Sequence, residues 1–165
     1  MFDRLRRTGI VSVAAIAFAV PAAAPAASPQ QATLQAMTGN WTCVTHDSSG
    51  KTWNETDVGT MWGSWLKTES TFPAQNGQPA GSGLTFLGYD AANRRWYVSF
   101  LNTAGEYGSA YSTSKTWGGS KWQDGYPNNH GSSSITASKN QFSIDTKMAG
   151  ANGKTMTSHE VCTKE

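Results

Sequence analysis

The residues best suited to chemistry in this sequence are its aromatic side chains. The chain of 165 residues contains seven tryptophans. Tryptophan combines a large contact area with one N–H donor. The high number of tryptophans therefore indicates either an aromatic-lined ligand cavity or a core whose other side chains are small. We favour the core for most of the tryptophans. A β-barrel can still hold one small ligand, and the residues predicted to line such a cavity are Trp53, Trp65, Tyr97 and Phe100.

The three histidines do not have the spacing of a metal site. His46, His130 and His159 lie far apart in the sequence, and no H-x-H, H-x-x-x-H or H-E-x-x-H motif is present. We therefore predict no metal ligands and no cofactor, and expect each histidine to have a surface or hydrogen-bonding role. Metal or haem ligation by a single histidine is the alternative.

No catalytic motif is recognisable. Nucleophilic catalysis needs a serine or cysteine supported by a base, and the G-x-S-x-G turn is absent. Glycosidase chemistry would need two carboxylates facing each other, which a sequence does not show. The candidate carboxylates are scattered along the sequence, at Glu55, Glu69, Asp124 and Asp145. No catalytic residue is therefore predicted.

The two cysteines predict a disulfide that closes the fold. Cys43 lies in the first expected strand and Cys162 in the last. Export, which the N-terminal residues described next indicate, would favour oxidation of the pair. A disulfide requires the two Cα atoms to lie within about 7 Å. The first and last strands should therefore be neighbours, as in a closed barrel.

Residues 1–26 are typical of a secretory signal peptide. Arg4, Arg6 and Arg7 precede an apolar run from Ile10 to Val20 that is too short to span a bilayer. The small residues at Ala24–Ala26 fit a cleavage site. We expect a periplasmic or secreted protein without a transmembrane segment after signal removal; an uncleaved anchor is the alternative.

The charge of the remaining chain gives no reason to expect nucleic acid or an anionic membrane as a partner. The chain has 13 Lys and Arg residues and 11 Asp and Glu residues. Residues 1–26 contain three of the basic residues and one of the acidic residues. Residues 27–165 therefore have no formal net charge. Without a basic run, electrostatic attraction to phosphates is not expected. Nothing in the sequence indicates the oligomeric state.

The stretch from Leu84 to Leu101 predicts an antiparallel hairpin around Asp90–Asn93. Both faces of its strands carry apolar residues, so both should be covered. Turn signals recur every ~8–12 residues, which predicts an all-β domain of eight to ten strands. We place it at residues 36–165, after a linker at 27–35 that could end in a helical turn. Within it, Met61 to Thr71 predicts a strand or bent pair, with Gly63 as a bulge and Trp62 and Trp65 on opposite faces.

Several local features together resemble a known family. Gly39-Asn40-Trp41 is a G-x-W at the first strand, Gly88-Tyr89-Asp90 opens a turn, and a polar strand with Ser158–Val161 ends the chain. The chain thereby resembles a small bacterial lipocalin-like family of uncharacterised proteins in the calycin superfamily. The resemblance implies an up-and-down antiparallel barrel in which Trp41 is structural, but no reaction and no ligand. The cysteine pair and the tryptophan-rich segment from Trp53 to Trp65 depart from the family pattern.

The sequence thus favours an exported β-barrel that binds a small hydrophobic or aromatic ligand without catalysis. One alternative is an enzyme, an isomerase or hydrolase, acting inside the barrel. It predicts inward titratable groups with displaced pKa values, for instance Glu55 or His159. A second alternative is a filled barrel that serves as an envelope-associated interaction module with an exposed apolar patch.

Overall fold

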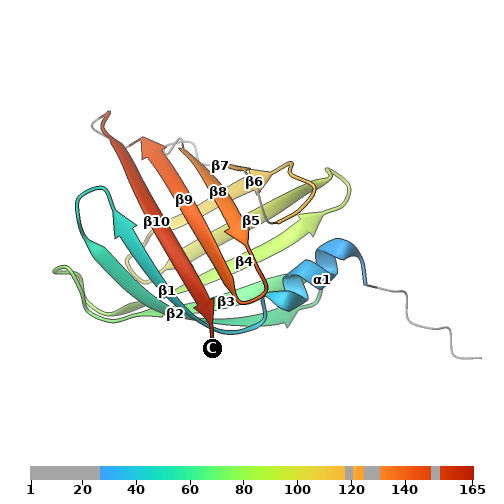
Figure 1. Cartoon of the computed structure of the whole chain (residues 1–165), viewed down its shortest axis with the longest axis horizontal. Coiled ribbons are helices and arrows are strands. Elements are labelled where there is room, and N and C mark those ends of the chain that lie inside the picture. The colour runs from blue at the N-terminus through green and yellow to red at the C-terminus, as the bar shows by residue number, and fades with distance from the viewer. Residues whose placement is uncertain (1–26, 118–120, 125–130, 150–152) are drawn as a thin grey trace, which may run out of the picture.

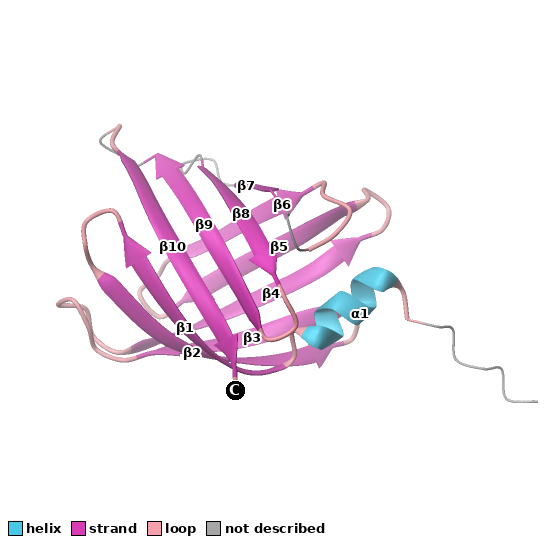
Figure 2. Cartoon of the chain, viewed as in Figure 1, coloured by secondary structure: helices cyan, strands magenta, loops and turns pink. Residues whose placement is uncertain are grey.

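The computed structural model describes residues 27–117, 121–124, 131–149 and 153–165, with only the backbone of residues 121–124. The described residues form one helix and ten strands in a closed barrel (Figures 1 and 2). Their bounds are α1 Pro29–Ala36, β1 Gly39–Asp47, β2 Thr52–Trp62, β3 Trp65–Phe72, β4 Gly81–Asp90, β5 Arg95–Asn102, β6 Tyr107–Ser112, β7 Lys121–Asp124, β8 Gly131–Ala137, β9 Gln141–Ala149 and β10 Thr155–Lys164.

The predicted all-β, up-and-down architecture is confirmed. Each strand pairs antiparallel with the next along the chain, and β1 closes the ring by pairing with β10. Cys43 lies directly opposite Cys162 in this last pairing, and the two form a disulfide with Cα atoms 4.0 Å apart. The first and last strands are therefore joined both by hydrogen bonds and by a covalent bond.

The predicted hairpin is formed by β4 and β5, in which Leu87 pairs with Val98. Asp90 stabilises its turn by accepting hydrogen bonds from the backbone N–H of Asn93 at 3.1 Å and from its Nδ2 at 2.6 Å. The left-handed backbone conformation falls on Arg94, with φ of 53°, and not on Asn93. The asparagine acts through its side chain instead.

The predicted bulge at Gly63 is wrong. β2 continues through Gly59 to Trp62, and Gly63 lies in the turn to β3 with φ of 61°. Because the chain reverses there, Trp62 pairs with Trp65. The two rings therefore project from the same face of the sheet. The parity rule applies only within one strand, and this segment is two strands.

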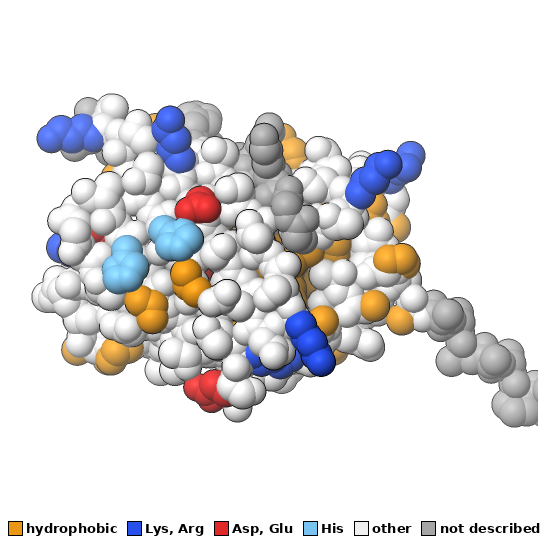
Figure 3. All heavy atoms as spheres, viewed as in Figure 1, with side chains coloured by type: hydrophobic (Ala, Val, Ile, Leu, Met, Phe, Trp, Pro, Cys, Tyr) orange, Lys and Arg blue, Asp and Glu red, His pale blue; other side chains and the backbone are white. Residues whose placement is uncertain are grey.

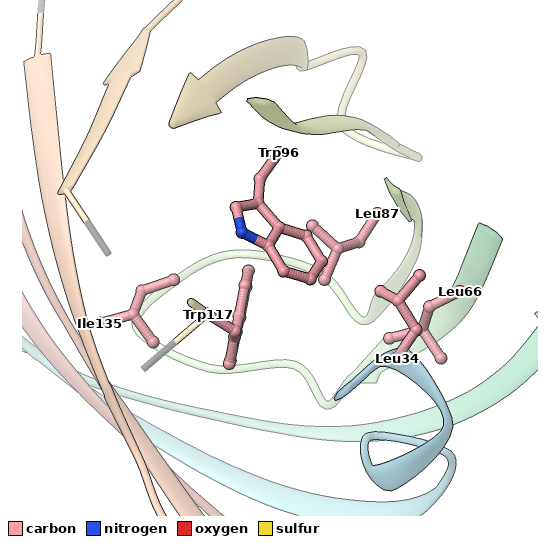
Figure 4. Close-up of a cluster of buried hydrophobic side chains, with 6 residues drawn as sticks. All are labelled: Leu34, Leu66, Leu87, Trp96, Trp117 and Ile135. Atoms are coloured by element: carbon pink, nitrogen blue, oxygen red, sulfur yellow. The ribbon is translucent and has the colours of Figure 1, made fainter. Parts of the chain in front are cut away.

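An apolar core lies inside the barrel and includes a side chain from α1 (Figure 4). Most of the segment expected as a linker at 27–35 belongs to α1, whose N-terminus is capped by the side chain of Ser28. Leu34 from this helix is buried against the barrel interior. The buried members of this apolar core are Leu34, Leu66, Leu87, Trp96, Trp117 and Ile135. Burial of such side chains is the main source of stability in the fold.

Trp41 has the structural position that the resemblance implied. It is 5% exposed, donates a hydrogen bond from Nε1 to the carbonyl of Met37 at 3.0 Å, and packs against Phe142. Lys164 lies over the same ring. Trp41 therefore joins the first strand to the end of α1 and to the closing strands.

Candidate functional site

The strand register brings three carboxyl groups together on the inner face of the barrel. Glu55 pairs with Cys43, and Asp57 follows two residues later on the same face of β2. Glu160 lies two residues before Cys162 on β10 and pairs with Thr45. Since side chains alternate along a strand, all three share the inward face with the buried disulfide. We call Glu55, Asp57 and Glu160 the acidic wall.

The acidic wall contacts the disulfide directly. Oε1 of Glu160 lies 3.2 Å from Sγ of Cys162, and Oδ2 of Asp57 lies 3.9 Å from Sγ of Cys43. A disulfide sulfur has no proton to donate, so these contacts do not satisfy the carboxylate oxygens. The hydroxyl of Thr45 donates to Oε2 of Glu160 at 3.2 Å. Among the described residues, Oδ1 of Asp57 is buried without a hydrogen-bond partner.

Burial changes the protonation of this wall. Desolvation, with repulsion from Glu160 and Asp57, raises the pKa of Glu55 to about 8. Burial also raises the pKa of Asp57, and it raises that of Glu160. No ion pair in the described part of the chain includes any of the three. At neutral pH Glu55 is therefore mostly protonated, and a cation brought to the wall would favour its ionised form.

Residues of the acidic wall and the disulfide form two clusters of residue types that can bind a metal ion. Cys43, Glu55 and Asp57 have ligand atoms within 4.8 Å of one another, and so do Cys43, Cys162 and Glu160. Both clusters include sulfur atoms that are bonded to each other in the disulfide. A cysteine binds a metal ion as a thiolate, which a disulfide sulfur is not. Without the sulfurs, each cluster is reduced to one or two carboxyl groups.

The apolar core continues into the acidic wall. On one row of the sheet, Glu160 pairs with Ile144, which in turn pairs with Ile135 of the apolar core. Trp96, also in this core, is 1% exposed, and its Nε1 has no hydrogen-bond partner among the described residues. Figure 4 shows this nitrogen directed toward the side where Ile135 and Trp117 lie. The interior thus contains an unused buried donor as well as the carboxyl groups.

Two of the four residues predicted to bind a ligand lie on the inner face. Trp53 pairs with Thr45, and its Nε1 donates to Oδ2 of Asp47 at 3.0 Å. A hydrogen bond from Ser49, followed by this one from Trp53, holds the pKa of Asp47 well below its usual range. Phe100 is 44% exposed, lies on the same face as the buried Trp96, and covers Gly108, where any Cβ would collide with its ring. Both aromatic residues lie toward the barrel end opposite α1.

The other two predicted residues, Trp65 and Tyr97, lie on the outer face. Their rings meet edge to face with centroids 6.3 Å apart, and Trp65 covers Gly88. Trp62, 66% exposed, packs beside Phe86 on the same surface. The four predicted residues therefore cannot line one cavity. Among these outer rings Trp62 is exposed, whereas Trp65, Tyr97 and Phe86 are half-buried.

Sequence reasoning found Glu55 but missed its partners. Asp57 lies two residues after Glu55, so alternation along a strand places both side chains on the same face. This relation could have been predicted from the sequence. Glu160 comes from the other end of the chain, and only ring closure brings it near. His159 pairs with His46 on the outer face and so does not join the inward titratable groups, while His130 lies outside the described residues.

Comparisons with known proteins define the class of fold. The chain matches no protein-family model and no curated protein. Solved β-barrels are similar in structure. The S-type phycobiliprotein lyase CPES from Guillardia theta has 11% identity and a TM-score of 0.57, over 82% of this chain and 92% of the lyase. EF1p2_mFAP2b bound to DFHBI has 10% identity and a TM-score of 0.52, over 82% and 99%.

A de novo designed fluorescence-activating β-barrel is similar to the same degree. It has 9% identity and a TM-score of 0.51, over 81% of this chain and 97% of the design. At these identities the likeness concerns the fold. Together with the closed strand order it makes this protein an antiparallel, up-and-down β-barrel. No helix among the described residues has the length and apolar character needed to cross a bilayer.

Proposed function

We propose that this protein is an exported barrel that binds a small aromatic or hydrophobic molecule carrying a basic group. The observation that carries the proposal is the acidic wall. Three inward carboxyl groups, for which the described residues supply no basic partner, lie next to an apolar core inside a closed sheet. Buried charges are normally paired, so a ligand amine would supply the missing partner.

The aromatic part of such a ligand has surfaces to contact. Trp53 and Phe100 lie on the inner face, and Ile144 connects the acidic wall to the apolar core. Ligand sites of this kind combine apolar walls with a few polar groups that fix orientation. A structurally similar barrel binds DFHBI, which supports the idea that this architecture accommodates a small molecule.

Binding of a cation would be coupled to proton release. Glu55 has a pKa of about 8 in the free protein, and a nearby positive charge lowers the pKa of a carboxyl group. At pH 7 an amine would therefore displace the proton of Glu55. Affinity for the amine should rise as the pH approaches 8, because less free energy is needed to ionise the wall.

A matched pair of probes tests the proposal. Tryptophan fluorescence is titrated with 2-naphthylmethylamine and with the neutral 2-naphthylmethanol. We expect the amine to bind at least ~10-fold more tightly, as one charge-assisted contact would provide. In Glu55→Gln combined with Asp57→Asn this preference should disappear. The control Glu69→Gln, at an exposed position on β3, should retain it. Equal affinities for both probes in the unmodified protein would refute the basic-group proposal.

A second candidate function is acid–base catalysis in the same interior. A carboxyl group with a pKa of about 8 is protonated at neutral pH and suits a general acid. This candidate predicts chemical turnover of a bound molecule, which product analysis would detect. Turnover that is lost in Glu55→Gln would favour it, whereas unchanged recovery of the bound molecule would favour simple binding.

A further inference from the structure

Two histidines from opposite ends of the chain are neighbours on the outer surface. His46 on β1 lies directly opposite His159 on β10, across the pairing that closes the barrel. Both side chains are exposed. Figure 3 shows the imidazoles together with an acidic side chain on this face. Directly opposed residues of an antiparallel pair have Cβ atoms about 4.5–5.5 Å apart, so both rings can reach one bound ion.

Each ring already uses its Nδ1 for a hydrogen bond. Nδ1 of His159 donates to Oδ1 of Asp145 at 2.7 Å, because a carboxylate can only accept. Nδ1 of His46 lies 2.9 Å from Oγ1 of Thr52. When Nδ1 carries the proton, the lone pair of a neutral imidazole is on Nε2. A ring with Nδ1–H held by a carboxylate is the usual arrangement of a metal-binding histidine.

The surroundings leave room for an ion and its water ligands. His46, His159 and Asp145 line a hollow of about 590 Å³ that also includes hydroxyl side chains of Ser134 and Thr157. Imidazole suits zinc and copper, with Zn–N distances of about 2.0–2.1 Å. We propose that His46 and His159 bind one divalent transition-metal ion, Cu²⁺ or Zn²⁺, through their Nε2 atoms. Asp145 is a positioning residue that fixes the ring of His159.

This site is separate from the proposed ligand site, because it lies on the opposite face of the sheet. It also has a structural consequence. The two ligands come from β1 and β10, so a bound ion links the strands that close the barrel. Such an ion binds the folded chain better than the unfolded chain, in which the two histidines are far apart, and this raises the folded population.

Calorimetric titration with CuCl₂ and with ZnCl₂ tests the site. We expect one ion per chain, and Cu²⁺ should bind more tightly than Zn²⁺. His46→Ala and His159→Ala should each weaken binding of the ion by at least ~10-fold. The third histidine provides the control, because His130→Ala should change the affinity little. Unchanged affinity in His46→Ala, or a loss confined to His130→Ala, would overturn the proposal. Both altered side chains are exposed, so circular dichroism should confirm that the variants fold.

The positioning role of Asp145 has its own readout. Asp145→Ala should weaken Cu²⁺ binding by about 10-fold. The electron paramagnetic resonance spectrum at saturating Cu²⁺ should still show two nitrogen ligands in this variant, but not in His46→Ala. In parallel, Cu²⁺ should raise the melting temperature of the unmodified protein and leave that of His46→Ala unchanged. A spectrum without coupled nitrogens in the unmodified protein would contradict the assignment.

Discussion

The two parts of the barrel interior have opposite energetic roles. The apolar core beside α1 is built from side chains such as Leu66 and Trp96, which are 2% and 1% exposed. Burying them stabilises the fold. The acidic wall instead withdraws three carboxyl groups from water, and the raised pKa of Glu55 records the unfavourable cost of ionising it there.

This difference indicates where stability and function are located. Buried ionisable groups that destabilise a fold are characteristic of functional sites. The disulfide lies among the groups of the acidic wall, with Cys43 beside Asp57 and Cys162 beside Glu160. The covalent closure of β1 to β10 thus stabilises the part of the barrel where the carboxyl groups weaken it.

The largest expected effect is in the apolar core. Leu66→Ala should lower the free energy of unfolding by about 2–5 kcal/mol, because it leaves a cavity among fully buried side chains. Urea denaturation measures the loss. The control Leu101→Ala, at a position 53% exposed, should change stability by less than about 0.5 kcal/mol. A loss of similar size in both variants would show that the core is not where stability is concentrated.

Removal of the disulfide should have the next largest effect. The double variant Cys43→Ala and Cys162→Ala should lower the free energy of unfolding by about 2–4 kcal/mol, because the bond closes a long loop in the unfolded chain. Denaturation with and without a reducing agent measures it, and only the unmodified protein should respond to reduction. Stability that is insensitive to reduction would contradict the closing role of this bond.

The third effect has the opposite sign. The folded-state pKa of Glu55 is about 8 against an ordinary 4.5, so the folded chain binds more protons than the unfolded chain between these values. Stability should therefore fall by about 4 kcal/mol as the pH rises from 4.5 to 8, and change little above 8. Glu55→Gln should remove most of this fall and be more stable than the unmodified protein at pH 8. Parallel pH profiles for both proteins would contradict this prediction.

The sequence was sufficient for features that depend on local pattern or on covalent chemistry. The β4–β5 hairpin followed from alternation around Asp90 and Asn93, and closure of the barrel followed from the two cysteines. Which face of a strand is inside did not follow, because alternation alone leaves two choices. The prediction therefore combined inward Trp53 with outward Trp65.

Apart from the disulfide, contacts between distant segments were not among the predictions made from the sequence. Glu160 joins Glu55, and His159 joins His46, only because β10 pairs with β1 in a particular register. The disulfide made that pairing predictable but not its consequence for the neighbouring side chains. A register aligned at Cys43 and Cys162 would have placed His46 opposite His159, and this inference was available from the spacing alone.

The protonation of Glu55 tests the central claim most directly. Its side-chain carboxyl carbon is followed by carbon-13 NMR against pH, with Glu55→Gln used to assign the signal, first in the free protein and then with 2-naphthylmethylamine. The account predicts a midpoint near 8 in the free protein and a lower midpoint with the amine bound. A midpoint near the ordinary 4.5, unchanged by the amine, would contradict an interior acidic site for basic ligands.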